Sequence, residues 1–298
     1  MLITMKNATK WRYFTSVVSV TLMLLSIGAL AVKGLNWGLD FTGGIVTEVQ
    51  LSPSVTSHQL DTQLDKALGQ DVSVITAGEP GRWVLRYAIP NQGTAPDIAN
   101  ALADIGSKVN VLNTSIVGPQ VGQELAEQGG LALLIAVLCI LGYLSYRFEW
   151  RLASGSVFAL AHDVIFVLGF FALTQMEFNL TVLAAVLAIL GYSLNDSIII
   201  ADRIREILIA KPNKPIQEVN NEAIAATFSR TMVTSGTTLI TVGALWLLGG
   251  GPLEGFSIAM FIGIMTGTWS SISVGTVLPE LFHLNGEHYM LKPVTEEP

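Results

Sequence analysis

Six long apolar runs constrain the fold of this chain more than any other feature of its sequence. A helix needs roughly 20 apolar residues to cross about 30 Å of hydrocarbon. Runs of this kind occupy residues 14–32, 131–146, 152–173, 180–200, 232–248 and 256–278. Only 13% of the 298 residues are charged, against roughly 25% in an average soluble protein. The sequence therefore predicts a polytopic α-helical membrane protein with six transmembrane helices in a lipid bilayer.

The positions of lysine and arginine predict how these helices are oriented. With residues 1–33 as a cytoplasmic N-terminus and first helix, eleven of the sixteen basic residues lie on the cytoplasmic side. Both termini are then cytoplasmic, with a tail at 279–298 and one long cytoplasmic loop at 202–229. Within that loop, residues 216–228 have the periodicity of an amphipathic helix lying at the membrane interface. A cleavable signal peptide is the alternative for the first run, but its length favours an uncleaved helix.

The segment between the first two runs, residues 34–128, is predicted to be a separate domain on the opposite side of the membrane. Its expected elements are a strand at 45–51, a helix at 56–68, strands at 72–77 and 83–89, a helix at 95–106 and a strand at 109–117. The order β-α-β-β-α-β is that of a ferredoxin-like unit. The predicted fold is therefore a six-helix membrane bundle with an external α+β ferredoxin-like domain between helices one and two, followed by five helices at 129–278.

Ionisable residues inside the apolar runs are the candidate functional site. Asp196, with Asn195 beside it, lies in the fourth run, and Asp163, next to His162, lies near the middle of the third. A charged side chain in hydrocarbon costs roughly 2.5–3.5 kcal/mol on insertion scales, so such residues usually face the bundle interior and mark ion pathways. Because adjacent residues point to different faces of a helix, we expect His162 and Asp163 to meet different neighbours.

Arg230 opens the fifth predicted helix and heads a row of hydroxyl side chains on one helix face. The members of this row are Thr234, Thr237, Thr238 and Thr241. Such a row can join helices, bond back to its own helix or line a water-filled path. Burial favours the neutral form of a carboxylate and a nearby arginine favours the anion, so a group balanced between them can load and release H⁺ or Na⁺. We therefore predict an ion-coupling site of Asp163, Asp196, Arg230 and Asn195, with a static buried ion pair as the alternative.

Other residue patterns indicate packing and argue against several function classes. Small residues recur at every fourth position of the last run, which predicts close helix packing at Gly263, Gly267, Ser271 and Gly275. The net charge of −7 and the absence of a basic stripe argue against a nucleic-acid partner. The single cysteine, Cys139, excludes a metal site of clustered cysteines, and no Ser/His elbow, HExxH or phosphate loop occurs. We predict no enzymatic activity, no cofactor and no metal.

Motifs along the whole chain resemble those of SecF, the smaller subunit of the SecDF protein-translocation motor. They are Trp37-Gly-Leu-Asp-Phe-Thr-Gly-Gly44, Gly118-Pro-Gln-Val-Gly122, Ala161-His-Asp-Val164, Gly191-Tyr-Ser-Leu-Asn-Asp196 and Ser229-Arg-Thr231. They follow the order and spacing of that family, which belongs to the RND-like exporters. Trp269 departs from the pattern, which has tyrosine there, but its indole can still donate a hydrogen bond.

This resemblance implies a function, partners and residue roles. SecF-like chains pair with SecD next to the SecYEG channel in the bacterial inner membrane, and the proton- or sodium-motive force then helps to pull preproteins across. The resemblance makes Asp196 the ion-responsive carboxylate and Arg230 its partner. It also implies a joint between the first helix and the periplasmic domain, formed by Gly38, Asp40, Gly43 and Gly44. A passive membrane scaffold with structural buried ion pairs, or half of an RND-type exporter, remain the alternatives.

Overall fold

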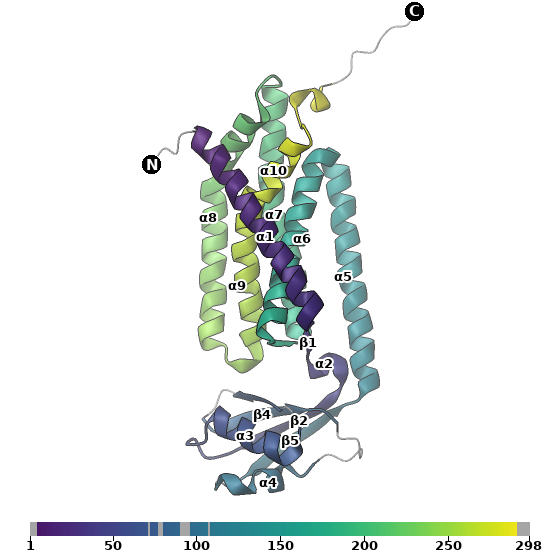
Figure 1. The fold of residues 1–298 in the computed structure, drawn as a ribbon, viewed down its shortest axis with the longest axis vertical. Helices are drawn as coiled ribbons and strands as arrows, with labels where there is room; N and C mark the ends of the chain where they lie inside the picture. The colour runs from purple at the N-terminus through teal and green to yellow at the C-terminus, as the bar shows by residue number, and fades with distance from the viewer. Residues whose placement is uncertain (1–4, 71, 77–79, 90–95, 107, 291–298) are drawn as a thin grey trace, which may run out of the picture.

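The computed structural model describes residues 5–70, 72–76, 80–89, 96–106 and 108–290, which form a helical bundle with a small sheet domain at one end (Figure 1). Six helices are long and apolar enough to cross a membrane, as predicted. They are α1 (Met5–Lys33), α5 (Pro119–Arg147), α6 (Trp150–Thr174), α7 (Leu180–Ala210), α8 (Ile216–Leu248) and α9 (Gly251–Ile272), the last continued by α10 (Val274–Leu281).

Helices α6, α7 and α9 form the centre of the bundle, whereas α5 stands at its edge and α1 crosses one of its faces (Figure 1). Small residues let α9 approach α7 closely. A Cβ atom on Gly267 would lie 3.0 Å from Cβ of Ser193, and one on Gly263 would collide with the side chain of Ile189. Ser271 is buried, and the Gly275 carbonyl leaves no room for a Cβ on Gly155 of α6.

The last span is broken into two helices, a feature that the apolar run at 256–278 did not predict. Ser273 separates α9 from α10 with φ −88° and ψ −88°, outside the helical region, and its hydroxyl donates to the carbonyl of Trp269 at 2.7 Å. Further along, Pro279 lies inside α10 and has no amide hydrogen to donate to the carbonyl of Gly275. Apolarity alone carries no signal for such a break.

The predicted loop at 202–229 is mostly helical, so that prediction was wrong. Helix α7 continues to Ala210 and α8 begins at Ile216, which leaves only residues 211–215 as the connection. Residues 216–228 are helical as predicted, but they do not lie flat at an interface. They are the first turns of α8, and Val219 and Ala223 are buried in the bundle. Their apolar periodicity reflects packing against α7 rather than against lipid head groups.

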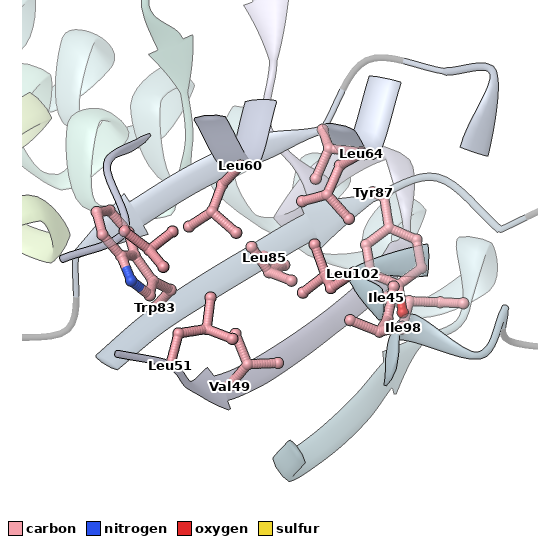
Figure 2. Packing of buried hydrophobic residues seen from close by; sticks show 12 residues of the cluster. Ile45, Val49, Leu51, Leu60, Leu64, Trp83, Leu85, Tyr87, Ile98 and Leu102 are labelled. Atoms are coloured by element: carbon pink, nitrogen blue, oxygen red, sulfur yellow. The ribbon is translucent and has the colours of Figure 1, made fainter. Parts of the chain in front are cut away.

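The sheet domain has the predicted ferredoxin-like order. Its elements are β2 (Gly44–Gln50), α3 (Ser57–Leu68), β3 (Ser73–Thr76), β4 (Arg82–Tyr87), α4 (Ile98–Ala101), the 3₁₀ turn η1 (Ala103–Ile105) and β5 (Asn110–Val117). The antiparallel sheet has the order β3-β4-β2-β5, with Ile45 opposite both Tyr87 and Ile116. Figure 2 shows its core, in which Leu60 and Leu64 of α3 lie over Leu85 of the sheet. We call this unit the ferredoxin-like domain.

The second helix of this domain is much shorter than the predicted 95–106, of which residue 95 lies outside the described part. Asp97 caps α4 by accepting from the amides of Ala99 and Asn100, and the helix ends after one turn at Leu102, where φ is −99° and ψ is 4°. The chain then passes through η1 to Gly106, whose φ is +72°. The periodicity came from Ile98 and Leu102, which are buried at the two ends of this single turn, and the helix does not continue beyond it.

Two predicted boundaries also change. The domain does not extend to 128, because α5 begins at Pro119, a favoured first helical position. The tail predicted at 279–298 folds against the bundle as far as Tyr289, through the rest of α10 and the 3₁₀ turn η2 (Gly286–Tyr289), while residues 291–298 lie outside the described part. Burial raises the pKa of the Tyr289 phenol to about 12, and the Glu149 carboxylate adds to this effect.

Candidate functional site

Asp196 lies where α7, α8 and α9 meet, and it is 2% exposed. Its Oδ2 accepts a hydrogen bond from Oγ of Ser235 on α8 at 3.3 Å, a long distance for two oxygen atoms. Oγ1 of Thr268 on α9 lies 2.8 Å from the same serine oxygen. The carboxylate on α7 is therefore linked to α8 by one long hydrogen bond, and through the Ser235 hydroxyl to α9.

Asp163 lies deeper in the bundle and has more donors. Its Oδ2 accepts from the hydroxyl of Ser193 on α7 and lies 2.9 Å from Oγ of Ser270 on α9. Its Oδ1 lies 2.9 Å from Nδ1 of His162, so the expectation that these neighbours meet different partners was wrong. Side chains of adjacent helical residues can still turn toward each other when both are long enough. Nε2 of His162 is buried with no hydrogen-bond partner among the described residues.

The two carboxylates belong to one polar layer of the bundle. Ser193, which donates to Asp163, precedes Asp196 by three residues on α7, about 4.5 Å along the helix axis and on the same face. The predicted meeting of Asp163 and Asp196 in the bundle interior therefore has a geometric basis. Both can accept a cation or a proton, and both face hydroxyl groups that can turn to follow such a change.

Arg230 and Asn195 are not part of that interior. Both side chains are exposed, and Arg230 forms no ion pair within the part of the chain that the structure describes. The guanidinium is nevertheless near enough to interact electrostatically with Asp196. Its predicted role as a direct partner is therefore replaced, in this structure, by an interaction at longer range.

The row of threonines below Arg230 bonds back to its own helix. Thr234 donates to the carbonyl of Arg230 at 3.0 Å, and Thr237 and Thr241 also donate to carbonyls one turn earlier. These contacts match the second of the uses that the sequence left open, bonding back to the same helix. Thr238 also accepts from the hydroxyl of Tyr192 on α7 at 3.2 Å, which matches the first use, the joining of helices. The polar side chains of α8 that point inward are Thr231 and Ser235, both buried. Each lies one residue after a predicted position, Arg230 and Thr234 respectively.

A buried polar cluster at the end of the bundle away from the ferredoxin-like domain was not predicted. Nη2 of Arg12 on α1 lies 2.6 Å from Oε1 of Glu280 on α10, and both side chains are almost fully buried. Nδ2 of Asn220 donates to the same Oε1 at 2.7 Å, and the Tyr13 hydroxyl donates to Oε2 at 2.9 Å. The arginine also donates to Oδ1 of Asn221 at 3.0 Å. The sequence contained one indication of this cluster, because Glu280 is a carboxylate just after the last apolar run.

The predicted joint residues connect the ferredoxin-like domain to α7. Gly38 follows the short strand β1 (Asn36–Trp37), which pairs in parallel with β6 (Glu177–Phe178) just before α7. Asp40, in the single turn α2 (Leu39–Thr42), accepts from the amide of Leu180. Gly43 has φ +74°, which favours glycine, and Gly44 begins β2 with too little room for a side chain next to the carbonyl of Tyr87.

Metal ligation finds no support in these positions. No group of three or more His, Cys, Asp or Glu side chains lies close enough together to hold a metal ion in the described ranges. The polar layer of the bundle supplies oxygen atoms from two carboxylates and several hydroxyls instead. Carboxylate and hydroxyl oxygens are acceptors that can bind a proton or an alkali cation.

Comparisons with known proteins point to one family. The profile described as "Protein export membrane protein SecD/SecF, C-terminal" matches residues 97–283, and "SecD/SecF GG Motif" matches residues 28–55. Proteins named "Protein translocase subunit SecF" from Vibrio alginolyticus and Escherichia coli O157:H7 are 41% and 39% identical to this chain. The matches cover 97% of this chain in both cases, and 93% and 91% of those relatives.

A solved structure has the same architecture. The crystal structure of SecDF, a translocon-associated membrane protein from Thermus thermophilus, matches with a TM-score of 0.81 and 33% sequence identity. A second, titled SecDF in super-membrane-facing form, matches with a TM-score of 0.70 and 34% identity. The first match covers 93% of this chain but only 38% of the SecDF chain, so this chain is similar to one part of that larger protein.

Proposed function

Because the chain belongs to the SecF family of protein translocase subunits, we propose that it uses an ion-motive force to assist preprotein translocation through the Sec channel. Asp196 is the residue that binds and releases the ion. The observation that carries this proposal is the contrast between its burial and the one hydrogen bond, at 3.3 Å, that it accepts from the described residues. A buried carboxylate with few donors gains most from a proton or a Na⁺ ion, because a long hydrogen bond and a guanidinium at longer range compensate its charge only in part.

We propose a SecD-like subunit as the direct partner. The match covers only 38% of the SecDF chain, and this supports a SecD-like part in the remainder of that protein. Exposed polar groups in membrane helices support the same inference, since Arg230 and Asn195 are costly against lipid and are better placed against another protein. The SecYEG channel and the preprotein complete the proposed assembly.

The proposed location is the bacterial inner membrane, with both termini in the cytoplasm and the ferredoxin-like domain in the periplasm. Lysine and arginine placement supports this orientation. The coupling ion is H⁺ or Na⁺, and the oxygen-rich layer around Asp196 and Asp163 suits either. Each elementary charge crossing the membrane supplies about 2.3 kcal/mol per 100 mV, so repeated cycles can drive mechanical work.

The test is preprotein translocation into inverted vesicles that carry this chain with a SecD-like partner. Asp196→Asn is expected to remove the gradient-dependent part of translocation while the complex still assembles. Asp202→Asn is the matched control, because Asp202 lies on the same helix but pairs with Arg147 at 2.5 Å outside the polar layer. Full gradient-dependent translocation by Asp196→Asn would contradict the proposal.

The passive scaffold is kept as a second candidate because of one observation. Asp163 is saturated with donors, and this arrangement suits a carboxylate that fixes three helices in register. On this reading, the loss of either carboxylate would lower the amount of assembled complex and the translocation activity in proportion. Measuring both quantities on the same vesicles separates the two candidates.

A further inference from the structure

The linker that joins α1 to the ferredoxin-like domain, residues 34–43, is attached to the start of α7 by directed hydrogen bonds. The amide of Gly38 donates to the carbonyl of Phe178 at 2.9 Å. Two residues further along each segment, the amide of Leu180 donates to Oδ2 of Asp40 at 3.1 Å. The first amides of a helix have no partner inside the helix, and the positive end of its dipole favours a carboxylate. Asp40 therefore holds the end of α7 from the domain side.

An ion pair makes a second connection at the same place. Nη1 of Arg86, on the central strand β4, lies 3.0 Å from Oε1 of Glu177, three residues before α7 begins. Both side chains are about one-fifth exposed, at 22% and 21%. Gly38 lies against this contact, since a Cβ atom there would be 2.6 Å from Oε1 of Glu177. A glycine at this position leaves the carboxylate free to reach the sheet.

A further contact of the sheet with the bundle, at the start of α9, has a different character. Ile75 of β3 packs against Gly251, the first residue of α9, through apolar atoms. Apolar contacts are not directional and permit sliding, whereas hydrogen bonds and ion pairs to a helix end fix its position. Helix α5 continues directly from β5 through Gly118, and of the other two helix ends described here, those of α7 and α9, α7 is the one held by directed bonds.

We propose that Asp40 and the Arg86–Glu177 pair are positioning residues that couple the ferredoxin-like domain to α7, so that movement at Asp196 is passed to the domain. Asp196 lies sixteen residues beyond Leu180, about 24 Å along one unbroken helix. When Asp196 gains or loses its ion, the packing around it changes and α7 moves as a rigid helix. The domain moves with α7, because it is bound to the first turn of that helix. This inference rests on the proposed function.

The experiment is a charge swap, read as gradient-driven translocation per assembled complex with the SecD-like partner. Arg86→Glu is expected to lower gradient-driven translocation several-fold, because two carboxylates then face each other. Combining Arg86→Glu with Glu177→Arg is expected to restore most of the loss. Asp40→Ala is an independent variant that removes the acceptor for the helix amide, and Asp40→Asn, which keeps an acceptor oxygen, is expected to lose less.

Arg82→Glu provides a matched control on the same strand. Nε of Arg82 lies 2.6 Å from Oε1 of Glu48, and that ion pair joins two strands of the sheet without reaching α7. The control is expected to leave gradient-driven translocation unchanged. Translocation measured without an ion gradient is expected to stay at the native level in every variant.

The outcomes separate this inference from the function on which it rests. Native-level translocation by both Arg86→Glu and Asp40→Ala, alongside an inactive Asp196→Asn, would overturn the coupling role and leave the proposed function standing. An equal loss of gradient-driven translocation in Arg86→Glu and Arg82→Glu would also overturn it. The loss would then come from damage to the sheet rather than from the contact with α7. An active Asp196→Asn would instead overturn the proposed function.

Discussion

Asp163 on α6 and Asp196 on α7 are buried carboxylates of the same polar layer, yet their surroundings differ. Asp163 is met by the hydroxyls of Ser193 and Ser270 and by the His162 ring. Within the described part of the chain, Asp196 accepts one hydrogen bond, from Ser235 at 3.3 Å. Both are within 2% of complete burial, so burial does not distinguish them.

The difference concerns how many hydrogen bonds a carboxylate must lose in order to bind or release an ion. Each donor that leaves a buried acceptor costs roughly 1–3 kcal/mol, so a saturated group is held in one state. A group with one weak donor has little to lose and can bind an ion that arrives from solution. The number of donors, more than depth in the membrane, therefore decides which carboxylate is fixed and which can cycle.

Glu280 extends this comparison and is expected to give the largest effect on stability. Its carboxylate is saturated by Arg12, Asn220 and Tyr13. Glu280→Ala leaves the arginine buried without its counter-ion, and breaking a buried pair in this way costs about 3–5 kcal/mol. The measurement is the melting temperature of the purified complex in detergent, with Glu287→Ala on the exposed turn η2 as the control. An unchanged melting temperature would show that saturation does not predict stability here.

Asp163→Ala is expected to have the second largest effect. It strands the Ser193 hydroxyl and the His162 ring in the interior, and we expect a loss of roughly 2–4 kcal/mol in unfolding free energy. Thermal unfolding and the yield of assembled complex both report this loss. If Asp163→Ala unfolds like the native chain but loses gradient-driven translocation, Asp163 is itself an ion carrier and the contrast with Asp196 fails.

Ser193→Ala sharpens the comparison, because it removes one donor and leaves the carboxylate in place. The expected loss is about 1–3 kcal/mol, the cost of one buried hydrogen bond to a charged or strongly polar group. Ser235→Ala is the matched substitution at Asp196 and is expected to cost less, because its bond is long. Equal shifts in melting temperature would contradict the assignment of a strong and a weak site.

Asp196→Asn is expected to have the smallest effect on stability and the largest on function. The amide keeps the size of the side chain, and the single bond to Ser235 contributes no more than about 1 kcal/mol. The melting temperature should therefore stay close to the native value while gradient-driven translocation is lost. A fall as large as that of Asp163→Ala would mean that Asp196 is structural too.

Much of the fold could be predicted because it follows from local patterns. Six apolar runs became six spans, and alternating strands with Gly- and Pro-rich turns became a ferredoxin-like sheet. Apolarity does not report where a helix starts or breaks. For that reason, α8 was divided at Arg230 and the break at Ser273 was missed.

The candidate site could be predicted only in part. Both carboxylates lie in the interior, since few other positions satisfy a carboxylate in a membrane helix. The inward face of α8 was assigned one residue out of phase, because Thr231 and Thr234 are chemically alike and only packing tells them apart. The bonds of Glu280 join residues too far apart in sequence for any periodic pattern to relate them.

The reach of the Glu280 cluster also sets an order of assembly during synthesis. The ferredoxin-like domain is complete within residues 44–117, so it can fold while most of the bundle is still unmade. The junction at Asp40 has to wait for Leu180, which is 140 residues later. Tyr13 and Glu280 are separated by 267 residues, so the N-terminal helix finds its last partners only when the final helix has arrived. Until then Arg12 has no counter-ion from α10, and its pairing marks a fully inserted chain.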